Sequence, residues 1–82
     1  MSTNKKEQQL TDAIRTAMEE SYRHPGKYFH VLVRNGRKPI VTDDGYKRAI
    51  LVAEGWCVVA NYRNGVRVII LSEAREVISG ET

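Results

Sequence analysis

The residues of this sequence best placed to do chemistry are cations that flank two predicted chain reversals. The tripeptide Arg-Asn-Gly occurs at residues 34–36 and again at residues 63–65. An Asn-Gly pair between extended segments is typical of a β-hairpin, because both residues tolerate the positive φ of a type I′ turn. Further basic residues follow each reversal and lie on a predicted helix between them. The candidate phosphate-binding residues are therefore Arg34, Arg37 and Lys38 at the first reversal, Arg63 and Arg67 at the second, and Lys47 and Arg48 on the helix.

The charge distribution favours polyanion binding at these positions. The 82-residue chain has a net charge of +3, from 13 Lys and Arg against 10 Asp and Glu, but residues 23–41 contain five basic residues and no acidic one. A local cationic field attracts phosphates and speeds encounters with acidic surfaces. Arg34 and Arg37 are expected to face each other across the first turn, where a bound anion would relieve their repulsion. The same charges would also suit a solvated surface that keeps a small protein in solution.

Three aromatic residues lie close to these cations in the sequence: Tyr28, Phe29 and Tyr62. Exposed aromatic rings beside cations can stack on nucleobases, and this arrangement is common in proteins that bind single-stranded nucleic acid. Aromatic residues in strands are more often part of the core or its rim. The sequence leaves both interpretations open, and the exposure of each ring decides between them.

The sequence shows no catalytic or metal-binding motif. Cys57 lies in an apolar predicted strand and is expected to be a small buried hydrophobic residue. His24 and His30 are six residues apart across a Pro-Gly turn, a spacing that matches no common zinc site. Asp43 and Asp44 fit the N-terminus of a helix. The glycine-rich motifs that hold nucleotide phosphates are missing from the sequence. We therefore expect a non-enzymatic protein without a metal or a cofactor.

Apolar periodicity predicts the elements that must position the cations. A stripe that includes Met18 and Tyr22 predicts one apolar face on a helix over residues 4–23. The later elements are predicted as a strand over 28–33, a return strand over 38–41, a helix over 44–54, a strand over 56–62, a return strand over 67–71 and a last helix from Ser72 to Gly80. Pro39 favours an edge position for the first return strand. The order α-ββα-ββα predicts an α+β fold with a mainly antiparallel sheet and helices packed on it.

Length and composition fit one domain over residues 1–82, with residues 1–4 and 80–82 expected to be frayed. No apolar run reaches the ~20 residues that span a bilayer, and the first ten residues lack the apolar stretch of a signal peptide. A single cysteine cannot form an internal disulfide. These observations favour a cytoplasmic location without a membrane partner.

Pairing across the second turn would place Tyr62 opposite Arg67, with two further pairs predicted as Ala60 with Ile69 and Val58 with Leu71. Both faces of this hairpin are then largely apolar. A hairpin buried on both faces is usually central in its sheet or covered by a partner. With so few residues available to cover two faces, the sequence predicts a homodimer.

The stretch over residues 42–71 resembles the helix-plus-wing half of a winged-helix domain, although a hairpin stands where that fold has its helix-turn-helix. The first functional hypothesis is a small nucleic-acid-binding or regulatory protein whose two basic tips, brought to one side of the sheet, contact the phosphates of DNA or RNA or an acidic protein surface. The alternative is a protein-interaction module, such as an inhibitor or adaptor of a larger bacterial or phage protein. The alternative requires an uncovered apolar patch, either near Trp56, Val58 and Leu71 or near Val66 and Val68.

Overall fold

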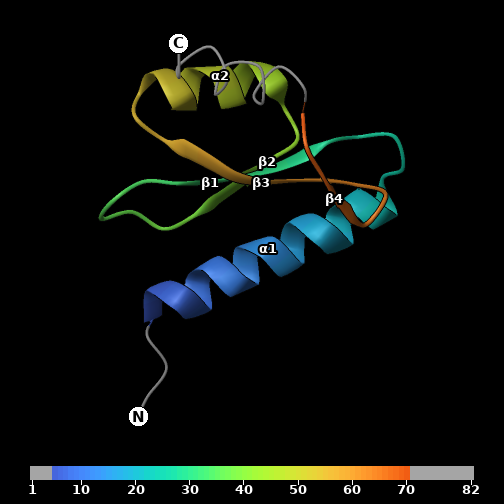
Figure 1. Cartoon of the computed structure of the whole chain (residues 1–82), viewed down its shortest axis with the longest axis horizontal. Coiled ribbons are helices and arrows are strands. Elements are labelled where there is room, and N and C mark those ends of the chain that lie inside the picture. Colours follow the sequence, from blue (N-terminus) through green and yellow to red (C-terminus); the bar gives the residue numbers. More distant parts are fainter. Residues whose placement is uncertain (1–4, 71–82) are drawn as a thin grey trace.

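The fold is a four-stranded antiparallel sheet with a helix on each face, as seen in a computed structural model that describes residues 5–70 (Figure 1). In chain order the elements are α1 (Lys5–Arg23), β1 (Phe29–Val33), β2 (Ile40–Thr42), α2 (Gly45–Ala53), β3 (Cys57–Arg63) and β4 (Val66–Val68). The strands lie in the order β2-β1-β3-β4, and each neighbouring pair is antiparallel. The predicted α+β class is confirmed. Within residues 5–70, neither helix is long and apolar enough to cross a membrane.

α1 covers one face of the sheet with part of its apolar stripe. Ala17 is fully buried, and Leu10, Ala13 and Ile14 pack against the same cluster. The strands complete this cluster with Phe29, Val31, Ala60 and Tyr62. Residues that favour helices, mainly long and unbranched, fill the solvent side of α1. The helix ends just before Pro25, because a residue that precedes a proline is disfavoured in the α region.

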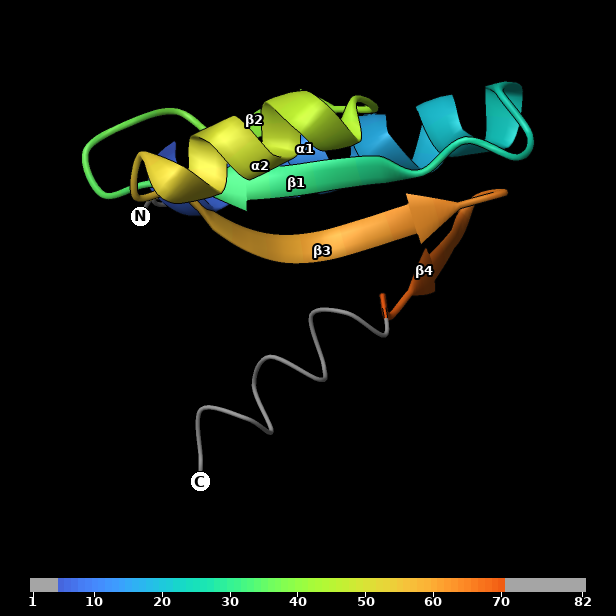
Figure 2. The ribbon, with the colours of Figure 1, turned by 90° about the horizontal axis from the view of Figure 1, so that it is seen from above.

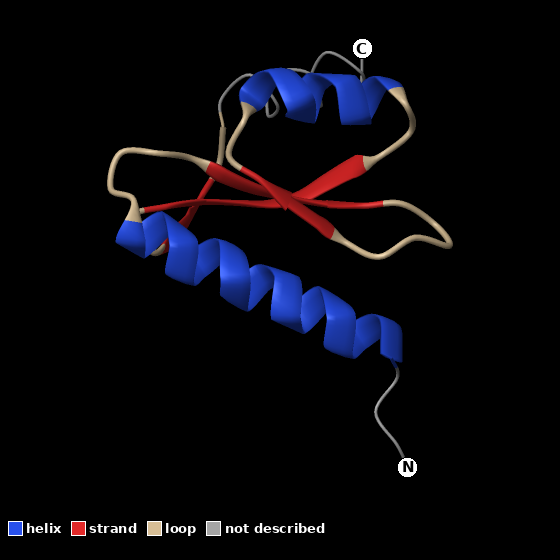
Figure 3. Ribbon diagram, turned by 180° about the vertical axis from the view of Figure 1, so that it is seen from behind, coloured by secondary structure: helices blue, strands red, loops and turns tan. Residues whose placement is uncertain are grey.

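α2 covers the opposite face, as the views from above and from behind show (Figures 2 and 3). Asp44 caps its N-terminus, where the side chain accepts two backbone hydrogen bonds from the first turn, at 2.9 and 3.3 Å. Gly55, at φ 104°, follows its C-terminus, and the N–H of Trp56 donates to the carbonyl of Leu51 at 3.0 Å. This termination turns Trp56 back onto the sheet. Leu51 and Trp56 then pack with Leu32 in a second core cluster.

A buried polar pair links the two central strands on the α2 side. Nδ1 of His30 and Oδ1 of Asn61 are 2.7 Å apart, and both side chains are buried. The two residues are direct partners in the β1–β3 ladder. Because an amide oxygen can only accept, Nδ1 of His30 carries the proton of this hydrogen bond. The pair therefore fixes the ring orientation of His30 and locks the register of the two strands.

The hairpins differ from the sequence predictions in several details. β2 begins at Ile40, so the first connection is longer than the predicted two-residue turn. β4 ends at Val68, so Ile69 does not pair with Ala60 as predicted. The second hairpin is not central, since β3 lies inside the sheet and β4 at one edge. The predicted partner Leu71 and the predicted last helix lie outside the described residues.

The resemblance to a winged-helix domain does not extend to the arrangement of the helices. The sheet lies between α1 and α2, with a separate core cluster on each side (Figure 1). In residues 5–70, therefore, the two helices do not pack together as a helix-turn-helix. The insertion of β1 and β2 between them is the physical reason, because both strands are needed to complete the sheet that separates the helices.

Candidate functional site

The two basic reversals lie at opposite ends of the sheet, which corrects the prediction that they share one side. The first follows the C-terminal end of β1, and the second follows the C-terminal end of β3. β1 and β3 are antiparallel neighbours, with Phe29 opposite Tyr62 and Val33 opposite Cys57. Antiparallel strands end at opposite ends of the sheet. The cations of the two reversals are therefore too far apart to form one positive patch. Figure 1 shows the β1–β2 connection and the β3–β4 connection on opposite sides of the molecule.

The first reversal forms an exposed loop, residues 33–39, which we call the first loop. Its ends are joined by the pairing of Leu32 with Ile40. Inside it, the N–H of Arg37 donates to the carbonyl of Arg34 at 3.0 Å, and Gly36 has a φ of 80°. Among the described non-glycine residues only Asn64 has a positive φ, so this loop does not adopt the predicted type I′ geometry. The loop is therefore wider than a tight hairpin turn.

The cations of the first loop have no acidic partner in the part of the chain that the structure describes. Arg34, Arg37 and Lys38 are all exposed. Within the described part of the chain, none of the three side chains forms an ion pair or a side-chain hydrogen bond. Nε of Arg34 lies 3.7 Å from the point where a Cβ on Gly55, just after α2, would stand. The first loop thus presents three exposed cations that have no carboxylate partner within residues 5–70.

A shallow pocket of about 260 Å³ lies between the first loop and the start of α1. Its apolar lining comes from Leu10, Val33 and Pro39. Its polar lining comes from Gln9, Arg34, Asn35 and Arg37, together with the backbone of Gly36. The pocket therefore has cations and amides around an apolar floor, which suits an anion with some apolar surface.

The cations of the second turn, residues 63–66, are engaged inside the molecule. Arg63 donates to the hydroxyl of Tyr28 at 3.2 Å, and its guanidinium lies 5.0 Å from the centre of the Tyr28 ring. Arg67 donates to the carbonyl of Val59 at 3.1 Å. Val59 lies at the irregularity in the β1–β3 register, where the ladder is locally disrupted. Both arginines therefore have structural roles that the sequence did not reveal.

The second turn is also attached to α1. The N–H of Gly65 donates to the hydroxyl of Ser21 at 2.9 Å, and that hydroxyl donates to the carbonyl of Met18. The N–H of Gly26 donates to the side chain of Asn64 at 3.1 Å. Asn64 and Gly65 have φ values of 55° and 80°, as a type I′ turn requires. The two Arg-Asn-Gly sequences thus have different geometries and different surroundings.

The two secondary candidates lie at the end of the molecule that holds the second turn. Lys47 is exposed on the first turn of α2. Arg48 is half-buried and lines a cavity of about 370 Å³ with Tyr28 and His30. Lys27 lines the same cavity, but it forms an ion pair with Asp43 at 3.3 Å. Neither Lys47 nor Arg48 is therefore close to the first loop.

The side chains considered for stacking and reactivity divide between core and surface. Phe29 and Tyr62 are buried in the cluster under α1, so they cannot stack on bases. Tyr28 is 40% exposed, but Arg63 occupies its face. Cys57 is exposed at the start of β3, which corrects the prediction that it is buried. Its position beside the turn from α2 leaves it outside the cover of either helix. Within residues 5–70, no group of three His, Cys, Asp or Glu side chains is arranged to hold a metal ion.

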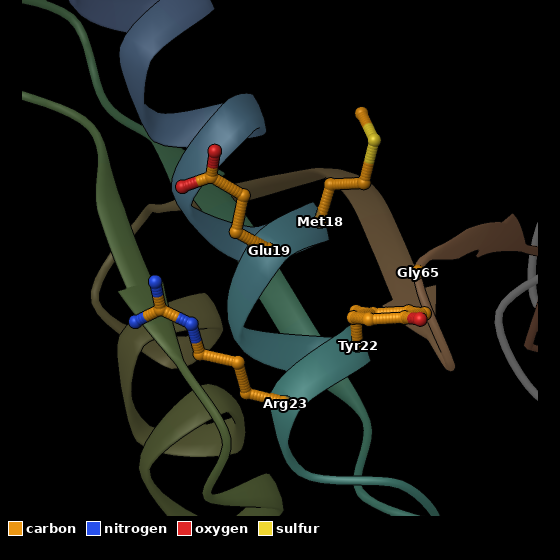
Figure 4. Close-up of a pocket in the computed structure, with 5 residues that line it drawn as sticks. All are labelled: Met18, Glu19, Tyr22, Arg23 and Gly65. Atoms are coloured by element: carbon orange, nitrogen blue, oxygen red, sulfur yellow. The ribbon is translucent and has the colours of Figure 1, made fainter.

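An apolar groove beside β4 was not predicted from the sequence. Met18 and Tyr22 belong to the predicted core stripe of α1, yet Tyr22 is 75% exposed. Together with Glu19, Arg23 and Gly65 they line a groove of about 330 Å³. Figure 4 shows the Tyr22 ring beside Gly65, Met18 one turn earlier on the same side, and the two charged side chains on the neighbouring stripe of the helix. The overlong stripe of apolar residues on α1 was the available signal.

The two apolar patches that the protein-interaction hypothesis named have different outcomes. Trp56 is buried and Val58 is half-buried in the cluster under α2, so the described part of the first patch is covered, and Leu71 lies outside the described residues. Val66 is 62% exposed at the edge of the sheet and Val68 is half-buried, so the second patch is open at Val66. A comparison of the chain with protein-family models, curated proteins and solved structures finds no match. Function must therefore be argued from the geometry of this chain.

Proposed function

We propose that this protein binds a polyanion, a nucleic acid in the first instance, through the first loop alone. The observation that carries the proposal is the set of three exposed cations, Arg34, Arg37 and Lys38, which have no carboxylate partner among residues 5–70. Surface cations that bind DNA or RNA release condensed counterions, and this release supplies most of the sequence-independent affinity. Cations already held by internal partners would have to give up those partners on binding. Arg63 and Arg67 therefore contribute little.

The loop geometry is suited to contacts with a phosphate backbone. Residues 33–39 project from one end of the sheet (Figure 3), and the start of α1 lines the pocket beneath them. The pocket beneath the loop adds amide groups from Gln9 and Asn35 to the two arginines. Arginine donates two hydrogen bonds to one phosphate, and backbone contacts of this kind fix orientation without reading sequence. The proposed activity is accordingly phosphate-dominated and weakly sequence-selective.

The test compares equal charge removals in the two Arg-Asn-Gly sequences. Binding of a labelled short duplex DNA, and of a single-stranded RNA of the same sequence, is measured by fluorescence anisotropy between about 50 and 200 mM salt. For duplex DNA, Arg34→Gln with Arg37→Gln should weaken binding and flatten the slope of log K against log salt by about 0.9 for each phosphate that the variant no longer neutralises. Arg63→Gln with Arg67→Gln removes the same charge and should leave the slope unchanged.

Circular dichroism and the unfolding midpoint of each variant show that it is folded before binding is compared. Glutamine keeps the aliphatic part of each side chain, so packing is largely retained. The proposal fails if the native protein does not bind either nucleic acid, or if the two double variants lose affinity and salt dependence equally. Equal losses would mean that overall charge, rather than the first loop, attracts the polyanion.

A further inference from the structure

The two edges of the sheet are protected to different degrees. β2 is preceded by Lys38 and Pro39, and lysine and proline are the residues that natural proteins place at free edges to prevent pairing. β4 has only one neighbouring strand among the described residues, and its single charged residue is Arg67. The guanidinium of Arg67 is turned back to the carbonyl of Val59 at 3.1 Å. Within residues 5–70, therefore, the edge of β4 carries none of the protection that β2 has.

Apolar side chains flank this edge on both faces of the sheet. On the α1 side, the groove beside Gly65 exposes Met18 and Tyr22 (Figure 4). On the other side, Val66 pairs with Arg63, whose side chain lies over Tyr28 on the α2 face. Val66 consequently projects to the α2 face and is 62% exposed. An added strand would thus bury apolar surface on both faces, which an exposed edge in a monomer rarely offers.

The charges beside the groove complement a second copy of the same surface. Glu19 and Arg23 are one helical turn apart on α1, and both line the groove. Arg23 also forms an exposed ion pair with Glu20 of its own helix at 3.2 Å, but exposed pairs of this kind contribute little stability, so the guanidinium can also reach a carboxylate of a second copy. In a twofold dimer every contact occurs twice: if one residue contacts a second residue of the other copy, the reverse contact is also formed. An antiparallel approach of two copies of α1 centred between these residues places Glu19 of one copy opposite Arg23 of the other, twice. The same twofold axis can relate two paired copies of β4, because antiparallel pairing of identical strands is symmetric.

We propose that β4 is a dimerisation edge: two copies of this chain pair antiparallel through β4 about a twofold axis. The C-terminal halves of the two α1 helices lie side by side, and the Met18–Tyr22 grooves close on each other. The result is a continuous eight-stranded sheet, derived from two four-stranded sheets. This inference is independent of polyanion binding by the first loop, which lies at the far end of the molecule.

The test is the concentration dependence of the mass of the full chain, measured by light scattering after gel filtration and by sedimentation equilibrium. The native protein should reach twice its 9.3 kDa chain mass. Val66→Lys places a gatekeeper charge on the edge and should raise the dimer dissociation constant at least about tenfold. Tyr46→Lys is the matched control, because Tyr46 is also a largely exposed side chain, at 77%, but lies on α2 rather than on β4. It should leave the dissociation constant unchanged.

A charge exchange tests the orientation of the dimer. Glu19→Arg alone places like charges across the proposed axis and should weaken the dimer, whereas Glu19→Arg with Arg23→Glu should restore it. The inference is overturned by a 9.3 kDa monomer at all concentrations, by equal effects of Val66→Lys and Tyr46→Lys, or by failure of the double exchange to restore association. A monomer that gains an ordered strand from another protein's peptide also overturns it, since the edge then has a different occupant.

Discussion

At the scale of single residues, the same tripeptide performs two different tasks. In the second turn, Gly65 fits closely against α1, because a Cβ added there would lie 3.3 Å from the Cβ of Tyr22. In the first loop, a Cβ added at Gly36 meets no atom within 4 Å. Both glycines have a φ of 80°, so both need the left-handed region that glycine adopts without strain. Only the surroundings differ.

We therefore expect alanine to be tolerated unequally at these two glycines. Gly36→Ala should lower the free energy of unfolding by about 1 kcal/mol, the cost of the left-handed conformation alone. Gly65→Ala carries the same backbone cost and also moves Tyr22 away from the turn, so the loss should exceed about 2 kcal/mol. Urea denaturation of both variants measures the difference. Equal losses, or a larger loss at Gly36, would contradict the assigned packing.

At the scale of elements, the sequence predicted what local patterns encode. The apolar stripe on α1, the acidic N-terminus of α2 and the strand segments were all readable, because each depends on neighbours a few residues apart. The sequence did not predict which strands are neighbours in the sheet. Alternation shows which side chains share a face, but it does not show that β1 and β3 are adjacent. Because β1 and β3 are antiparallel neighbours, the two reversals that follow them lie at opposite ends of the sheet.

The contact between α1 and the second turn is a tertiary feature that no local pattern predicts. Ser21 is fully buried, and its hydroxyl accepts a hydrogen bond from the N–H of Gly65. Ser21→Ala leaves that N–H without its partner and should lower the free energy of unfolding by about 1 kcal/mol, after a small gain in helix propensity. Thr16→Ala, at an exposed position on the same helix, should be neutral or slightly stabilising.

Hydrogen exchange adds a local readout for this contact. In Ser21→Ala the amide of Gly65 should exchange faster than in the native protein, while amides of the β1–β3 ladder keep their protection relative to global stability. If Ser21→Ala and Thr16→Ala have the same stability, and Gly65 keeps its protection, the hydroxyl does not hold the turn.

At the scale of the whole molecule, only one of the two predicted basic reversals remains as the candidate site. The types of the residues were readable, since charge and turn propensity are properties of the chain itself. The availability of each cation was not, because it depends on contacts between distant residues. Arg63 reaches Tyr28 and Arg67 reaches Val59, whereas the cations of the first loop reach no carboxylate within residues 5–70. The proposal therefore assigns ligand binding to the first loop, whereas Arg63 and Arg67, at the other end of the sheet, contact groups of the fold itself.

The most direct test of this account is to identify which end a polyanion contacts. Amide resonances of the full chain are followed by two-dimensional NMR during titration with a short duplex DNA at fixed salt. The account predicts progressive shifts over residues 34–38, with the amides of residues 63–66 unchanged. Shifts at residues 63–66, or equal shifts at both ends, would contradict the assignment of the first loop as the binding site.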